Sequence, residues 1–88
     1  MQLPIKTRIL QYAIQLNSEF TASDAYRDLK SEYPGEKFFN PKTVEEYVES
    51  LLGVGFLSAT RTEFDAQGKL LIYCKATDYG KSRSKYMR

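Results

Sequence analysis

Histidine and tryptophan are absent from this sequence of 88 residues, and Cys74 is its only cysteine. Without histidine and with a single thiol, the chain can form neither an internal disulfide nor a His/Cys zinc site. No apolar run approaches the roughly 18 residues that span a bilayer, and Pro4 interrupts the region where a secretory leader would need an apolar stretch. These absences favour a cytoplasmic protein with no membrane partner.

The groups typical of catalytic sites are missing too. The sequence has no glycine-rich phosphate loop, and no candidate nucleophile stands beside a candidate base. Asp24, Asp28 and Glu32 recur at helical spacing, but such a ladder is typical of a solvated helix face. Cys74 lies in an apolar stretch, which predicts a packing residue and not a nucleophile. We therefore expect a non-enzyme that needs no cofactor.

The chain does contain enough apolar and aromatic residues for one core. Hydrophobic residues make up 42% of it, with seven Tyr and five Phe, which fits a globular domain. Its length corresponds to one domain. A deep active-site cavity is not expected in a chain that buries so little volume.

Charge is unevenly distributed along the sequence. The formal net charge is +2, but four of the thirteen cations follow residue 80 and no acid follows Asp78, so residues 1–78 carry −2 and the last ten residues carry +4. We predict a domain over residues 1–80 and a basic tail over residues 81–88, an arm that neutralises phosphates. A disordered, solubilising terminus is the alternative for this tail.

Three helices are predicted from apolar periodicity and capping residues. Pro4 suits the first position of a helix that ends near residue 17. Thr21 and Asp24 form a capping-box-like pair at the start of a second helix. Asn40 is an N-cap followed by Pro41 at the first position of a third. The predicted inward faces are Ile5, Ile9, Tyr12, Ala13 and Leu16, then Ala22, Ala25, Tyr26, Leu29 and Tyr33, then Val44, Tyr47, Val48, Leu51 and Leu52.

Glycine and proline mark where these helices end and where strands begin. Pro34-Gly35 stops the second helix, and Gly53 with Gly55 can adopt the left-handed conformation that ends the third. Residues 56–64 and 70–76 are rich in β-branched and aromatic side chains and flank a polar stretch, which predicts a β-hairpin. The stretch from Thr77 onward is too polar for a core face of its own, although Tyr79 and Tyr86 can dock back on the domain.

Three segments resemble the winged helix-turn-helix family of bacterial, archaeal and phage regulators. EFTASDAYRDL is similar to the family's entry into its second helix, and VEEYVESLLGVGFL to the passage from recognition helix to first wing strand. YCKATDYGKS is similar to the close of the second wing strand, with Ala76 where Leu is usual. The resemblance covers about residues 5–81. It implies an α+β winged helix fold: a three-helix core followed by a two-stranded antiparallel β-hairpin wing.

In DNA-binding members of this family, the start of the third helix reads base edges in the major groove and the wing contacts the backbone. Asn40 has an amide suited to adenine, and Lys42 an ammonium suited to guanine or phosphate. Asn40 can instead be a plain cap, and Arg61 can pair with Glu63 two residues on. Arg27 and Lys30 on the second helix are further candidates for backbone contacts. The candidate DNA-binding residues are Lys37, Asn40, Lys42, Thr43, Glu46, Arg61, Lys69, Lys81, Arg83 and Lys85.

Glu45, Glu46 and Glu49 on the outward side of the third helix oppose this interpretation, because carboxylates repel phosphates. They are typical of a solvated face, favoured by the helix dipole. They leave open an alternative, a winged-helix protein-interaction module whose acidic face meets a basic partner. A third alternative is an RNA-binding module that uses Tyr47, Phe38 or Phe39 as stacking platforms, although these aromatics fit the core better.

The leading hypothesis is a small sequence-specific regulator of transcription, of prokaryotic or viral origin, that binds double-stranded DNA. One helix end and one wing bury too little surface for tight specific binding, which favours a homodimer. No segment is an obvious dimerisation helix.

Overall fold

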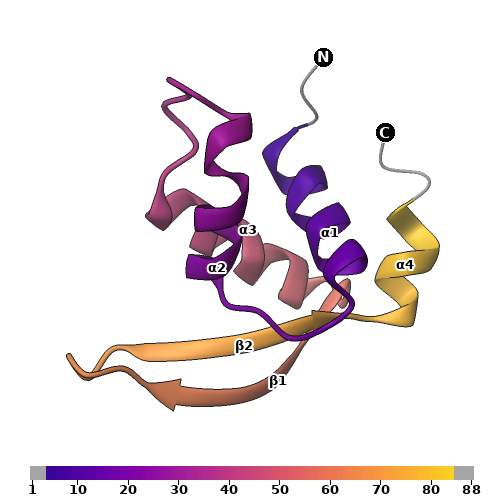
Figure 1. The fold of residues 1–88 in the computed structure, drawn as a ribbon. Coiled ribbons are helices and arrows are strands. Elements are labelled where there is room, and N and C mark those ends of the chain that lie inside the picture. The colour runs from indigo at the N-terminus through magenta and orange to yellow at the C-terminus, as the bar shows by residue number, and fades with distance from the viewer. Residues whose placement is uncertain (1–3, 85–88) are drawn as a thin grey trace.

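The computed structural model describes residues 4–84, within which four α-helices accompany one two-stranded antiparallel sheet. The chain forms α1 (Ile5–Leu16), α2 (Ala22–Leu29), a 3₁₀ turn (Lys30–Glu32), α3 (Pro41–Gly53), β1 (Leu57–Phe64), β2 (Leu70–Ala76) and α4 (Asp78–Ser84). Figure 1 shows α1, α2 and α3 above the hairpin, with α4 beside α1 and away from the hairpin turn. The predicted α+β class, helices followed by an antiparallel hairpin, is confirmed.

Side-chain caps fix where α2 and α3 begin. The Thr21 hydroxyl accepts from the Asp24 amide at 3.2 Å, and the Asp24 carboxylate accepts from the Thr21 amide at 3.0 Å, so the predicted capping box is confirmed. Asn40 caps α3 and Pro41 takes its first position, again as predicted. Pro4 lies one residue outside the predicted place, since its extended backbone makes it the N-cap of α1.

Of the two glycines expected to end α3, only one adopts the left-handed conformation. Gly55 has φ +82°, whereas Gly53 is the last residue of the helix. Gly55 is therefore the residue that turns the chain from α3 toward β1.

The hairpin has the predicted strands and an irregularity that the sequence does not reveal. Phe64 pairs with Leu70 at the turn end and Leu57 with Ala76 at the other end, while Thr60 is an extra residue in β1, a β-bulge. Phe20 forms an antiparallel bridge with Cys74 on the free edge of β2. The link between α1 and α2 is thereby attached to the sheet.

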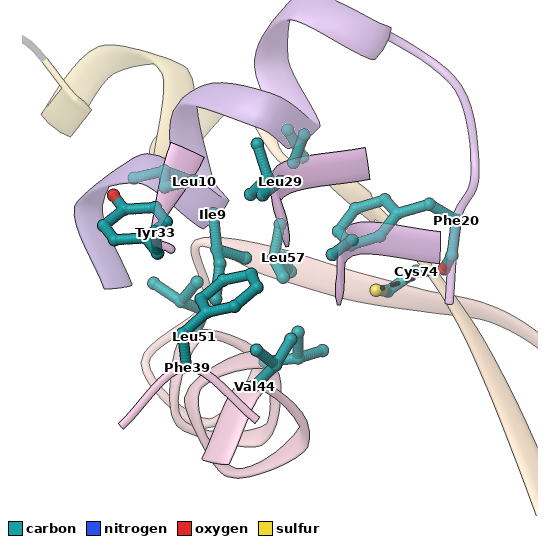
Figure 2. Close-up of a cluster of buried hydrophobic side chains, with 14 residues drawn as sticks. Ile9, Leu10, Phe20, Leu29, Tyr33, Phe39, Val44, Leu51, Leu57 and Cys74 are labelled. Atoms are coloured by element: carbon teal, nitrogen blue, oxygen red, sulfur yellow. Dashed lines mark hydrogen bonds between the residues drawn. The ribbon is translucent and has the colours of Figure 1, made fainter. Parts of the chain in front are cut away.

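The core lies between the three long helices and the helix-facing side of the hairpin (Figure 2). Fully buried side chains come from every layer, because the apolar face of each helix turns inward. Two positions of α1 differ from the prediction: Leu16, expected to point inward, is 41% exposed, and Leu10, which is not in the predicted face, is fully buried. Phe20 packs beside Cys74, where the two strands of the bridge meet. The largest fully buried side chains are Phe20, Ile9, Leu10, Leu29, Leu51, Leu57, Val44 and Cys74.

The helix α4 is not among the predicted elements, but the Tyr79 ring docks on the domain as expected, with its centre 5.3 Å from that of the Phe56 ring. The Thr77 hydroxyl donates to the carbonyl oxygen of Gly55 at 2.7 Å and accepts from the Gly80 amide at 2.9 Å. Gly80 is buried against the Phe56 backbone so closely that a Cβ there would collide with the Phe56 carbonyl. A polar segment thus docks through a hydroxyl and a glycine instead of an apolar face.

Candidate functional site

The outward face of α3 is charged and exposed. Val44, Val48 and Leu51 are buried, and at about 100° per residue the opposite side of the helix carries Lys42 and Glu46. Both are exposed, as is Glu49 next to them. The charged face of α3 thus carries two of the predicted DNA-binding residues, Lys42 and Glu46.

Within residues 4–84 no helix is long and apolar enough to cross a membrane.

Asn40 holds the start of this face in place with both ends of its amide. Its Oδ1 accepts from the Thr43 amide at 2.9 Å, and its Nδ2 donates to the Lys37 carbonyl oxygen at 3.0 Å. The capping role considered for Asn40 is confirmed. These two bonds fix the amide in the cap and leave one N–H of Nδ2 and one lone pair of Oδ1 for any further contact. Thr43, in the first turn, is half-buried.

Two lysines lie exposed around this cap. Lys37 is in the turn before α3 and Lys42 is in its first turn. Neither ammonium lies within ion-pair distance of a carboxylate in the part of the chain that the structure describes. Between them Phe38 is 65% exposed, so the expectation that its ring fits the core is wrong. The start of α3 therefore presents two unpaired cations and one aromatic ring to solvent.

The glutamates of α3 divide into two groups. Glu45 lies 3.6 Å from the Lys69 ammonium, which ties the hairpin turn to the side of α3. Glu46 and Glu49 are exposed, as predicted for a solvated face. Lys69 thus lies beside α3, where its ammonium is paired with the carboxylate of Glu45.

Arg61 belongs to a different surface, the side of the hairpin that faces away from the helices. Its Nε donates to the Glu19 carboxylate at 2.8 Å, its guanidinium pairs with Glu63, and its guanidinium carbon lies 3.7 Å from the centre of the Tyr73 ring. Thr60, the bulged residue, donates to the same Glu19 carboxylate at 2.6 Å. The pairing alternative for Arg61 is confirmed. We call Glu19, Thr60, Arg61, Glu63 and Tyr73 the hairpin clasp.

Each charged group of the hairpin clasp is paired with a group of opposite charge. Hydrogen bonds from Thr60 and then Arg61 hold the pKa of Glu19 below its usual range, and the Glu19 carboxylate raises the pKa of Arg61. Sequence reasoning missed Glu19. The clasp depends on the bulge at Thr60, and no local pattern in the sequence predicts that extra residue.

Lys81 and Arg83 lie near the end of α3 and not near its start. Lys81 donates to the Asn17 side chain at 3.3 Å, and the Arg83 guanidinium lies 5.4 Å from the Tyr79 ring centre. Both belong to α4, which packs beside α1 near the end of α3 (Figure 1). The 13 residues of α3 span roughly 18 Å. The expected flexible arm is therefore wrong for residues 81–84, and Lys85 and Tyr86 lie outside the described residues.

The acidic ladder of α2 holds two helices together instead of facing only solvent. The Tyr12 hydroxyl donates to Asp28 at 2.6 Å, and Arg27 pairs with Asp24 and Asp28 at 3.1 and 3.0 Å. Burial and then this hydrogen bond raise the pKa of Tyr12, while Arg27 and then Tyr12 lower the pKa of Asp28. Arg27, which was a candidate for contact with the DNA backbone, is thus paired with two carboxylates of its own helix.

Cys74 is fully buried, and burial raises the pKa of its thiol to about 12. The thiol lies 3.5 Å from the Phe20 carbonyl oxygen. The predicted packing role is confirmed.

Comparisons with known proteins give the fold a counterpart. No protein-family model matches the chain, and no curated protein matches it. Among solved structures, it is similar to a putative transcriptional regulator from Thermoplasma acidophilum, with a TM-score of 0.69 and 17% identity over 93% of this chain and 74% of that one. At this identity the similarity shows the fold, which is consistent with a winged helix.

Proposed function

We propose that this chain is a small DNA-binding regulator that inserts the start of α3 into the major groove of double-stranded DNA. The observation that carries the proposal is the pair of exposed, unpaired ammonium groups of Lys37 and Lys42 around a rigid helix cap. A capped helix start with cations is the part of a helix-turn-helix that meets phosphates and base edges.

The turn of the hairpin supports the same surface. The contact of 3.6 Å between Lys69 and Glu45 keeps the turn beside α3, so that a duplex against one meets the other. On DNA, Lys69 exchanges a surface carboxylate for a phosphate, a modest cost since exposed ion pairs are weak. We assign Lys37, Lys42 and Lys69 to the DNA contact, with Thr43 beside them. Asn40 and Arg61 act as structural residues.

Such a surface is small, which favours binding as a homodimer on two half-sites. The similar solved structure is described as a putative transcriptional regulator, and this agrees with a regulatory role for the present chain. Glu46 is the further candidate from the sequence. We place it at the edge of the contact, where its carboxylate can accept from a cytosine amino group.

The test is a fluorescence-anisotropy titration against random-sequence duplex DNA at low and moderate salt. We expect salt-sensitive binding, and about tenfold weaker binding for Lys42→Gln, because one lost contact to DNA costs on the order of 1–3 kcal/mol. Lys75→Gln is the matched control, since Lys75 is an exposed lysine on β2 and on the opposite side of the sheet from the helices. No binding at low salt, or equal losses for both variants, contradicts the proposal.

A second candidate function is favoured by one observation on the hairpin. Phe64 and Leu70 face each other near the turn and are 73% and 47% exposed. An exposed apolar pair next to the acidic face of α3 fits a protein partner with basic and apolar side chains. If DNA does not bind, a partner whose binding is lost in Glu46→Gln and in Phe64→Ser identifies this function instead.

A further inference from the structure

The outer edge of β1 is open to pairing with another strand. The sheet has two strands, so β1 is hydrogen-bonded to β2 along one edge, and the further bridge from Phe20 is on β2. In Figure 1, β1 is the lower strand, and among residues 4–84 no segment pairs with its other edge. Natural proteins often block such an edge with proline or lysine. Residues 57–64 contain neither, and the bulge at Thr60 is the one irregularity in their register.

The hairpin turn shows which backbone groups of β1 face this edge. The Asp65 amide donates to the Lys69 carbonyl oxygen at 2.9 Å, so these two residues form a hydrogen-bonded pair. Hydrogen-bonded and non-hydrogen-bonded pairs alternate along an antiparallel ladder. The backbone of Glu63 and that of Arg61 therefore bond toward β2. Thr62, which lies between them, turns its amide and carbonyl outward.

The opposite strand supports the same alternation. The Cys74 amide donates away from β1, to the Phe20 carbonyl oxygen at 2.8 Å. Tyr73, the preceding residue, therefore bonds toward β1, where its partner is Arg61. Both strands thus place the backbone groups of Thr62 on the outer edge.

The charges along this edge are complementary to a second copy of themselves. In an antiparallel pair of two β1 strands centred on Thr62, Arg61 of each chain lies opposite the partner's Glu63. Because Arg61 also contacts Glu63 of its own strand, the four side chains form a square of alternating charge.

Neighbouring registers lack this complementarity. Centring the pair on Arg61 or on Glu63 places two like charges opposite each other, which is destabilising. Centring it on Phe64 places Glu63 opposite the partner's Asp65. Of the registers centred on residues 61–64, only the one at Thr62 brings opposite charges together without a like-charge pair.

From this pattern we infer that the chain forms a symmetric homodimer in which the outer edges of two β1 strands pair about Thr62. The two Thr62 residues exchange both backbone hydrogen bonds. Phe64, which is 73% exposed, lies diagonal to the partner's Thr62, within reach of an aromatic ring. Each chain contributes few residues, so the dimer is weak, with a dissociation constant on the order of 100 µM. The inference rests on the proposed function for its role, because DNA binding calls for a homodimer, but the pairing itself needs no DNA.

The experiment is sedimentation velocity on the full chain without DNA, from about 10 µM to about 1 mM, a range around the expected dissociation constant. We expect the sedimentation coefficient to rise with concentration from that of a monomer toward that of a dimer. Thr62→Pro should stay monomeric throughout, because it removes the outward amide. The hairpin should remain folded, because proline is tolerated on an edge strand where the N–H faces solvent. Circular dichroism checks the fold of each variant.

Two further variants test the register. Glu63→Lys places an ammonium opposite the partner's Arg61, twice in the symmetric interface, and should raise the dissociation constant about tenfold. Glu36→Lys is the matched control, since it makes the same charge change in the exposed loop before α3, and should leave the dimer unchanged. Thr62→Cys should form a disulfide-linked dimer under mild oxidation, because Cα atoms in a hydrogen-bonded pair lie about 5.5 Å apart, within the range of a disulfide. Ser58→Cys, four residues from the axis, should not.

Three results would overturn the inference. The first is a wild-type chain that is monomeric at every concentration, and the second is a dimer that persists in Thr62→Pro. The third is an equal loss of dimer in Glu63→Lys and in Glu36→Lys. A chain that stays monomeric yet binds DNA overturns this pairing alone, and a chain that dimerises as described yet does not bind DNA overturns only the proposed function.

Discussion

The two ends of α3 have opposite surroundings. Its start is exposed and carries the unpaired cations Lys37 and Lys42 beside a cap made by Asn40. The turn that follows its end is held by α4, because Gly80 packs onto the backbone of Phe56 and the Thr77 hydroxyl donates to the carbonyl oxygens of Gly55 and Phe56. The start of α3 thus carries unpaired charge, and its end leads into a turn that α4 holds in place.

The comparison separates cations that contact other residues of the fold from cations that have no such partner. Lys81 and Arg83, which look like the most basic feature of the sequence, belong to α4 and contact Asn17 and Tyr79. Lys42 stands alone in a segment with more acids than bases. Net charge along a sequence therefore locates a binding surface poorly unless the contacts of each cation are known.

The largest effect should come from adding a side chain at Gly80, where α4 packs on the Phe56 backbone. Gly80→Ala should destabilise the domain by about 3 kcal/mol, because the new Cβ collides with backbone that cannot rotate away. Gly53→Ala is the matched control, since position 53 is helical with open space around it, and it should stabilise by up to about 1 kcal/mol. Urea unfolding followed by circular dichroism measures both changes in stability. Equal effects would show that Gly80 does not pack closely on the Phe56 backbone.

Next in size is the contrast in DNA affinity between the two ends. Lys42→Gln should weaken binding about tenfold, and Lys81→Gln by less than about twofold, because only the first lies where the duplex approaches. Anisotropy titrations at one low salt concentration give the ratio. A larger loss for Lys81→Gln would move the DNA contact to α4 and reverse the comparison.

A smaller effect should separate capping from reading at Asn40. Asn40→Ala should cost about 1 kcal/mol of stability through loss of the cap. Asn40→Ser keeps an acceptor for the Thr43 amide and should restore most of it. If Asn40→Ser is as stable as the wild type yet loses specific DNA binding, then the amide reads a base and the structural assignment fails.

The smallest effect concerns the acids that follow Lys42. Glu49→Gln should strengthen DNA binding by about two- to threefold, since it removes one repulsion near phosphates that is partly screened by salt. The same titration measures it, with stability unchanged because Glu49 is exposed. Weaker DNA binding in this variant would mean that the carboxylate is itself a contact.

Much of the fold is predictable because its signals are local. The capping box of Thr21 and Asp24 and the cap at Asn40 each depend on residues three positions apart, and the sequence places both correctly. The β-branched and aromatic content of residues 56–64 and 70–76 likewise predicts the two strands, which the structure places at residues 57–64 and 70–76. Such features need no knowledge of distant contacts.

What the sequence does not reveal depends on pairs far apart in the chain. Gly80 in a polar stretch looks like a helix breaker, yet it allows close packing on Phe56 and so permits α4. Glu19 joins Arg61 only because a bulge at Thr60 redirects β1. The same division holds for the candidate site. The positions of Lys42 on the third helix and Lys69 at the hairpin turn can be predicted from the order of elements. The structural roles of Arg61 and Lys81 depend on contacts with Glu19 and Asn17, which lie far away in the sequence.

The bridge between Phe20 and Cys74 has a consequence for how the domain folds. It joins positions 54 residues apart, and Phe20 is among the largest buried side chains. Closing so long a loop costs entropy before the contact repays it. Helices α1, α2 and α3 can pack on one another before the hairpin forms. During synthesis, however, the ring of Phe20 lacks its contact with Cys74 until β2 has left the ribosome. The native core is therefore completed only once the hairpin has formed.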